Sequence, residues 1–372
     1  MKKFLGKVCF ILIGAALGVA MALLMDRFVP GALDLPGLSF AGIWAGALVW
    51  MYVVIYLSIP LHEAGHLVCG LLTGYEFVSF RVGKTIWTKR DGKLVRGRCQ
   101  VAGTGGQCLM TPPGAPDKSF PYALYNLGGA LANGLAAVLL WAAALAVNGI
   151  PGLMCAIAAV TSLAVALMNL LPFPGVCNDG RNLLDLRKSD EARRAFWITL
   201  EANARLSEGM RPRDLPADWT EPLPELTKRT PPLTFGLVIL EAARRMDEGA
   251  YDETMALLKK LLEYPQVVPA QRLAAQGDLL LLTLLTVGPG AEAGALCTPK
   301  LLGALRAGRT SPPSQCALYA AARLQTGNEK DAQRARAALE KALLTHPYPG
   351  ESELYRELFD AVDHKAQTLC GT

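Results

Sequence analysis

Histidine is scarce in this sequence, with four residues among 372, and charged residues make up only 19% of the chain. No CxxC pair occurs among the nine cysteines, so a zinc site built from cysteines is not expected. No basic segment with interleaved aromatic residues occurs either, which argues against nucleic-acid binding. With 52% hydrophobic residues and a positive mean hydropathy, the composition instead indicates a membrane protein with a soluble part.

Apolar runs predict about four membrane spans, at residues 4–25, 40–73, 121–147 and 152–172. The last two share an uncharged tract from 119 to 178, in which "NGIPG" (148–152) is the expected turn. The first run has an alternative interpretation as a signal peptide, because the basic start "MKKFLGK" precedes its apolar core. The second is longer than a simple crossing and contains Pro60, so its inner end is expected to kink or to continue into the interface.

Basic residues predict the orientation of these spans. The segment 74–118 carries eight lysines and arginines, whereas the segment 26–39 carries only Arg27. By the positive-inside rule, the N-terminus, this basic segment and everything after about residue 173 are cytoplasmic in a multi-pass protein of the cell membrane. No cysteine falls in a predicted external loop, so the thiols are expected to stay reduced, without a disulfide scaffold.

The cytoplasmic parts are predicted to be one β-hairpin and a helical domain. Residues 77–103 alternate apolar and polar side chains on both sides of Asp91 and Gly92, which suits a hairpin, and the stretch "GTGGQCLMTPPGAP" (103–116) after it is expected to be a loop. A linker, 186–232, leads to a domain at 233–372. Helical hairpins expected at 241–265 and 321–347 resemble the tetratricopeptide repeat, and an irregular helical bundle is the alternative.

Two of the four histidines lie at the end of the second apolar run, in "LHEAGHL". On a helix, His62 and His66 occupy one face, because they are four positions apart. Two imidazoles so placed can bind one metal ion, and Glu63 can act on a metal-bound water as general base. The alternative is a pair of surface histidines near a helix end, but ionisable residues at membrane depth are costly and mark functional sites.

A catalytic zinc ion usually has three protein ligands and one open position. The other histidines, His346 and His364, fall in the distal helical domain, so the third ligand is expected to be a carboxylate near the cytoplasmic membrane face. Asp179 is the first acidic residue after the uncharged tract and is our candidate. The alternative is that Asn178, Asp179 and Gly180 form a turn in which the aspartate caps the next helix.

These motifs together resemble the site-2 protease family of zinc intramembrane metalloproteases, over about residues 40–185. The family carries HExxH on one core helix and an Asn-x-x-Pro…Asp-Gly motif on a later one, matched here by "NLLP" from Asn169 and by Asp179-Gly180. The resemblance implies Zn²⁺ ligands at His62, His66 and Asp179, with Glu63 as catalytic base. Asn169 and Asp179 are ten positions apart, whereas about eight is usual in the family.

A middle family helix has a small-residue motif ending in asparagine, and "NLGGALANG" (126–134) is similar to it. The resemblance implies that Asn133 holds the substrate carbonyl or the developing oxyanion, and ordinary helix packing by small residues is the alternative. Residues 1–185 would then form the transmembrane metalloprotease domain.

The predicted function is zinc-dependent cleavage of a membrane-spanning or membrane-associated protein near the cytoplasmic face. The hairpin would pair with the unwound substrate, and the helical domain would bind a cytoplasmic protein partner. A catalytically silent membrane scaffold that binds partners through its helical domain is the alternative of a different class. The sequence leaves the substrate and the oligomeric state open.

Overall fold

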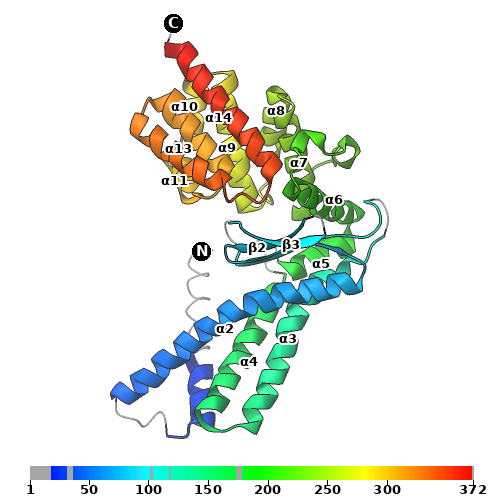
Figure 1. The fold of residues 1–372 in the computed structure, drawn as a ribbon, viewed down its shortest axis with the longest axis vertical. Helices are drawn as coiled ribbons and strands as arrows, with labels where there is room; N and C mark the ends of the chain where they lie inside the picture. The colour runs from blue at the N-terminus through cyan, green and yellow to red at the C-terminus, as the bar shows by residue number, and fades with distance from the viewer. Residues whose placement is uncertain are drawn as a thin grey trace. The chain divides into compact units, whose positions relative to one another are not determined.

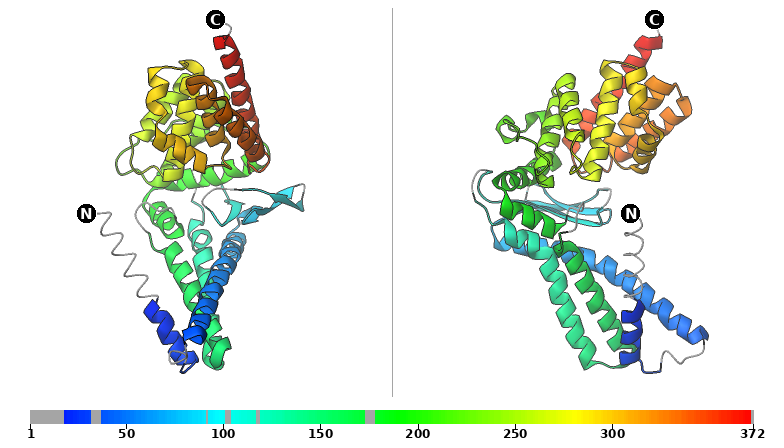
Figure 2. Two further views of the ribbon diagram at one scale, coloured as in Figure 1. Left: turned by 90° about the vertical axis from the view of Figure 1, so that its left-hand side faces the viewer. Right: turned by 180° about the vertical axis from the view of Figure 1, so that it is seen from behind.

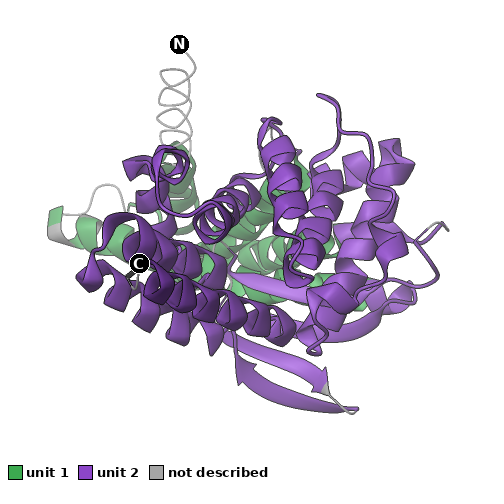
Figure 3. Ribbon diagram, turned by 90° about the horizontal axis from the view of Figure 1, so that it is seen from above, with its two compact units in different colours: residues 1–69, 127–171 green, residues 70–126, 172–372 purple. Residues whose placement is uncertain are grey.

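The computed structural model describes residues 18–31, 37–90, 92–100, 104–116, 119–172 and 178–370, without the side chains of Leu38, Phe40, Arg90 and Cys370. The described chain is mainly helical, as predicted, and has one small antiparallel sheet (Figures 1 and 2). It divides into two compact units: unit 1 comprises residues 1–69 and 127–171, and unit 2 comprises residues 70–126 and 172–372 (Figure 3). Two of the three boundaries along the chain fall inside the helices α2 (Gly37–Leu72) and α3 (Tyr122–Ala146), and the third follows residue 171.

Three described helices are long and apolar enough to cross a membrane. They are α2, whose apolar part is Ala41–Leu72, α3, and α4 (Gly149–Leu170), with mean hydropathies of 1.8, 1.8 and 2.2. Only 17%, 28% and 50% of their most apolar stretches are buried within the protein, so much apolar surface is left for lipid contact. The predicted second, third and fourth spans are therefore present as helices of sufficient length, and α2 continues through Pro60.

Residues 18–28 are also helical and overlap the end of the predicted first span. Positions 4–17 of that span lie outside the described residues, so a fourth span stays a prediction. The described part of this helix packs into unit 1 through three apolar side chains. They form a buried cluster with residues of α2, α3 and α4: Met21, Met25, Phe28, Ala47, Ala144, Leu153, Ala156 and Ile157.

The turn between α3 and α4 lies where the sequence predicts it, although α4 begins at Gly149 and not at residue 152. Gly149 has φ +73°, a conformation that glycine adopts without strain. A Cβ on Gly152 would lie 2.1 Å from the carbonyl oxygen of Val147, so the first turn of α4 requires a glycine there. The two helices consequently run side by side (Figures 1 and 2).

The sheet of unit 2 has four antiparallel strands in the order β3-β2-β1-β4. Their bounds are β1 Glu76–Val82, β2 Thr85–Arg90, β3 Lys93–Arg98 and β4 Gly106–Thr111. The predicted hairpin is present as β2 and β3, in which Arg90 faces Lys93 across the expected turn. Asp91 lies outside the described residues, and Gly92 has φ +75°.

The hairpin prediction was wrong in two respects. The chain already reverses at Gly83 (φ +58°), where Val82 pairs with Thr85, so the segment before Gly92 is two strands and not one. The glycine-rich stretch predicted to be a loop contains β4, which pairs with β1. In β4, Leu109 and Met110 are buried, so packing overrides the weak strand propensity of the flanking glycines.

The sheet packs against α6 (Asp190–Ser207), which follows the short helix α5 (Asp179–Lys188). Val78 of β1 and Leu109 of β4 form a small apolar cluster with Ala204 and Leu200 of α6. The range 186–232, predicted as a linker, thus contains a full helix. It also contains 3₁₀ turns at Pro212–Asp214 and Ala217–Trp219, and a third, Pro232–Thr234, leads into the next helix.

The rest of unit 2 is helical, and both predicted helical hairpins are present. The first is α7 followed by α8, joined at Gly249 (φ +80°), and the second joins a π-helical turn to α13 at Gly327 (φ +62°). Their likeness to the tetratricopeptide repeat stays a prediction. The helices are α7 Phe235–Asp247, α8 Tyr251–Leu262, α9 Pro269–Thr286, α10 Ala291–Leu296, α11 Pro299–Ala307, α12 Pro312–Ala320, the π turn Ala321–Thr326, α13 Glu329–Leu343 and α14 Pro349–Cys370.

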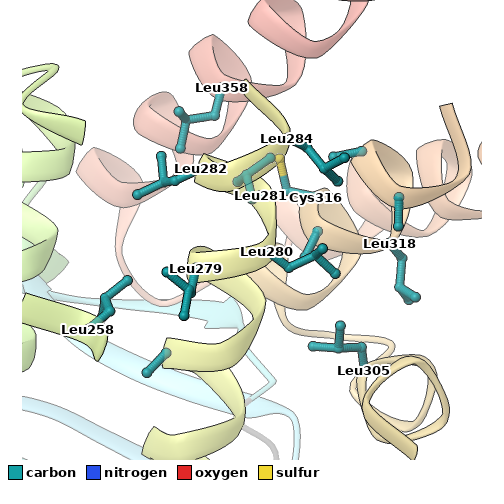
Figure 4. Close-up of a cluster of buried hydrophobic side chains, with 14 of the residues drawn as sticks. Leu258, Leu279, Leu280, Leu281, Leu282, Leu284, Leu305, Cys316, Leu318 and Leu358 are labelled. Atoms are coloured by element: carbon teal, nitrogen blue, oxygen red, sulfur yellow. The ribbon is translucent and has the colours of Figure 1, made fainter. Parts of the chain in front are cut away.

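Helix α9 is the centre of this helical core (Figure 4). Its leucines from 279 to 282 are at most 4% exposed, so the helix is apolar on all sides at this level, as a fully buried helix must be. Side chains from four neighbouring helices enclose it: Leu258, Leu305, Cys316, Leu318 and Leu358. The sheet, α5, α6 and these helices form one unit.

Candidate metal centre

His62 and His66 meet on one face of α2, as their spacing predicts. Their Nε2 atoms are 3.1 Å apart and their rings are edge to face, with centroids 4.8 Å apart. Both side chains are buried, at 9% and 8% exposure. Two nitrogens bound to one tetrahedral zinc at about 2.0–2.1 Å would lie roughly 3.3 Å apart, so the pair is already close to the spacing of metal ligands.

Asn133 of α3 approaches the same site from behind His62. Its side chain is fully buried, and its Nδ2 lies 3.2 Å from His62 Nδ1. Its Oδ1 is buried and has no hydrogen-bond partner among the described residues. If the amide is turned, Oδ1 accepts from His62 Nδ1–H, and the Nε2 lone pair is then available to a metal.

Glycines let α3 come this close to α2. A Cβ on Gly129 would lie 2.4 Å from the imidazole of His62. Likewise, a Cβ on Gly65 would lie 2.2 Å from the carbonyl oxygen of Gly128, and one on Gly128 would lie 2.4 Å from that of Gly65. The backbones therefore touch at a glycine pair, as in close helix packing in membranes. The motif "NLGGALANG" thus allows close packing of α3 on α2 and also supplies the residues that contact His62.

Gly65 is a residue that the sequence analysis did not single out. It lies between the two histidines in "HEAGH", on the side of α2 that meets α3. Its residue type alone was not a sufficient signal, because an added Cβ at Gly42 or Gly46 in the same helix would meet nothing within 4 Å. Glu63, the predicted base, directly follows His62 in α2 and is half-buried.

Asp179 belongs to unit 2, where it is the first residue of α5. The capping residue of this helix is Asn178, whose side chain accepts a hydrogen bond of 2.9 Å from the Arg181 N–H. The alternative interpretation, in which Asp179 caps the helix, is therefore wrong. Asp179 is half-buried in the first turn, where the helix dipole favours an ionised carboxylate.

Among the residues that the structure describes, the other histidines and cysteines offer no second centre of this kind. His346 Nε2 lies 2.9 Å from Glu351 in the helical part of unit 2, and His364 is exposed on α14, as their sequence positions predict. No cysteine within the described ranges forms a disulfide.

Comparison of the chain with protein-family models, with curated proteins and with solved structures finds no match.

Proposed function

We propose that the chain is a zinc-dependent intramembrane endopeptidase of the site-2 protease type, cleaving a membrane-spanning or membrane-associated protein near the cytoplasmic face. One observation carries the proposal. The Nε2 atoms of His62 and His66 converge to 3.1 Å in the buried face of a helix apolar enough to cross a membrane. Burying two imidazoles in such a helix is costly without a role, and metal binding supplies one.

The proposed ligands of one metal ion are His62, His66 and Asp179, a group of histidine and aspartate side chains that could hold such an ion. Two imidazole nitrogens and one carboxylate oxygen are a common ligand set for catalytic zinc, with a position left for water. Because Asn178 caps α5, capping does not account for Asp179. The glutamate between the histidines favours zinc-dependent peptide hydrolysis over a purely structural metal site.

Each residue of the site would have a separate role in peptide hydrolysis. Zinc held there would lower the pKa of a water molecule and polarise the scissile carbonyl. The carboxylate of Glu63 would take a proton from the attacking water and deliver it to the amine nitrogen of the leaving segment. Asn133 would be a positioning residue, since its Oδ1 can fix the His62 tautomer that ligates through Nε2. The oxyanion role implied by the resemblance stays a prediction.

The sheet is the proposed site of substrate pairing. The strand β3 is at the sheet edge, and all six of its residues are exposed, so its outer edge suits an added strand. A transmembrane substrate must unwind before cleavage, because helical hydrogen bonds hide its amides. Deleting β2 and β3 should abolish cleavage and leave zinc bound, and full activity after the deletion would refute this role.

The proposed topology has four spans, with the N-terminus and unit 2's helical part in the cytoplasm. It is supported by the three apolar helices and by the basic residues of segment 74–118. An impermeant thiol reagent should label Asn148→Cys in intact cells and Lys365→Cys only after lysis. The reverse pattern would invert the topology. In this orientation the helical part, which we interpret as tetratricopeptide-like, would bind a cytoplasmic partner.

The metal assignment is tested with full-length protein purified in detergent. Zinc content measured by mass spectrometry should be one per chain in the wild type and in Glu63→Gln, and should fall strongly in His66→Ala. His364→Ala is the matched control, because that histidine is exposed on α14, and it should keep its zinc. Equal zinc in His66→Ala and the wild type would refute the site.

The third ligand is tested in the same way. Asp179→Asn should weaken zinc binding, whereas Asp252→Asn, an exposed aspartate in the first turn of α8, should not. Cleavage is then tested by comparing the membrane proteomes of cells that carry the wild type or Glu63→Ala. A full-length membrane protein that accumulates only with Glu63→Ala would be the substrate, and identical proteomes would favour the silent scaffold.

A further inference from the structure

Unit 2 contains a pocket of about 1140 Å³ whose charged lining is entirely basic. No acidic residue is among the described residues that line it. The basic side chains come from three helices and one connecting segment. Arg181 is on α5, Arg272 on α9 and Lys300 on α11, and Lys228 and Arg229 lie in the segment that precedes α7. A pocket lined by charges of one sign concentrates ligands of the opposite sign.

Most of this positive charge is not neutralised by the protein. Lys228, Arg229 and Lys300 make no ion pair with any residue that the structure describes. The guanidinium of Arg272 donates to the carbonyl oxygens of Leu262, at 2.8 Å, and of Tyr264, which are neutral acceptors. Only Arg181 is paired, with Asp185 at 3.0 Å.

Two helices also begin at this pocket. Val268 and Pro269 at the start of α9 line it, as do Thr298 and Lys300 at the start of α11. Helix N-termini present N–H groups and a partial positive charge, which suit phosphate oxygens. The first turn of α9 has no side-chain cap, so its N–H groups are suited to an external acceptor, whereas in α11 the Leu301 N–H already donates to the Thr298 hydroxyl.

The remaining lining indicates that the ligand is more than an inorganic ion. Val267, Leu273 and Leu301 give the pocket an apolar wall. The Oε1 of Gln266 is buried without a hydrogen-bond partner in the described chain, while its Nε2 donates to the Lys228 carbonyl. That oxygen is closed off from solvent, so the apolar wall, and not this amide, indicates an organic part of the ligand.

We propose that this pocket binds an organic phosphate of nucleotide size. The phosphates would lie among the basic side chains and the start of α9, and the organic part would lie against the apolar wall. The pocket volume of about 1140 Å³ far exceeds that of a phosphate ion and lies just above the roughly 300–1,000 Å³ usual for small-ligand sites, so an organic phosphate of nucleotide size has room.

Isothermal titration of the full-length protein in detergent tests the proposal. The probes are the four common ribonucleoside diphosphates, pyrophosphate and adenosine. At least one nucleotide should bind about tenfold more tightly than pyrophosphate, adenosine should not bind, and added salt should weaken nucleotide binding. Absence of binding by every nucleotide, or equal binding of pyrophosphate, would overturn the proposal.

Variants place the binding at this pocket. Lys300→Gln should weaken nucleotide binding on the order of tenfold, and Lys228→Gln with Arg229→Gln should weaken it further. Arg272 is left intact because it holds two backbone carbonyls. The control is Lys330→Gln, an exposed lysine on α13 outside the pocket, which should bind as the wild type does. Equal affinity in all variants would place the nucleotide elsewhere and refute the assignment.

Discussion

Replacing Gly129 with alanine is expected to displace the first histidine of the metal centre. The new Cβ would lie 2.4 Å from the ring of His62, whereas ordinary contacts begin at 3.4 Å, so the ring must retreat by about 1 Å, the difference between the two distances. Metal–ligand distances tolerate deviations of only about 0.2 Å. Removing hydrogen bonds behind a ligand already costs about 10- to 100-fold in metal affinity. Displacing the ligand itself should therefore weaken zinc binding by at least about 100-fold.

The assay is a zinc titration against a competing fluorescent chelator, with full-length protein in detergent. The matched control is Gly134→Ala on the same helix, because a Cβ there meets nothing within 4 Å. It should bind zinc as the wild type does. Circular dichroism should show the same helix content in both variants, which separates a local displacement from unfolding. Zinc affinity in Gly129→Ala equal to that of Gly134→Ala would refute the placement of His62.

Three further predictions concern other contacts. Asn133→Leu removes the buried amide beside the first histidine and should lower zinc affinity about 10- to 100-fold in the same titration, while Asn133→Asp should retain more of it. Arg211→Ala should destabilise unit 2 by about 3 kcal/mol in denaturant unfolding, because the buried carboxylate of Asp247 loses its ion-pair partner and keeps only the hydrogen bond from the Arg213 N–H. Burial raises the pKa of Asp278 to about 7, so this carboxyl stabilises the fold below pH ~4 and progressively less as the pH rises to 7. Asp278→Asn should therefore raise Tm relative to the wild type at pH 8 and change it little at pH 4, and equal shifts at both would contradict the burial effect.

The features predicted well from the sequence are those that depend on local patterns. Apolar length predicted α2, α3 and α4, and helical spacing predicted that His62 and His66 share a face. The hairpin turn expected at Gly92 is also present, and this glycine has φ +75°. In each case a few neighbouring residues contain the whole signal.

The features missed depend on contacts between distant segments. The strand β4 is hidden in a glycine-rich stretch, and only its pairing with β1 and the burial of Leu109 and Met110 make it a strand. The contact of Gly65 with Gly128, and that of Asn133 with His62, join positions more than sixty residues apart. The sequence pattern of α2 or of α3 alone does not predict which face of the other helix it will contact.

The unusual spacing between Asn169 and Asp179 fits the metal-ligand proposal better in the structure than in the bare sequence. The helix α4 ends at Leu170, directly after Asn169, and α5 begins at Asp179. The two extra residues relative to the family pattern therefore fall in the connection between the helices. Lengthening a connection costs little free energy, since closure entropy grows only with the logarithm of loop length. An insertion within α4 would instead rotate the following residues about the helix axis and move them along it. The ligand role of Asp179 is thus compatible with the longer spacing, and Asp179→Asn is the variant on which the zinc proposal most depends.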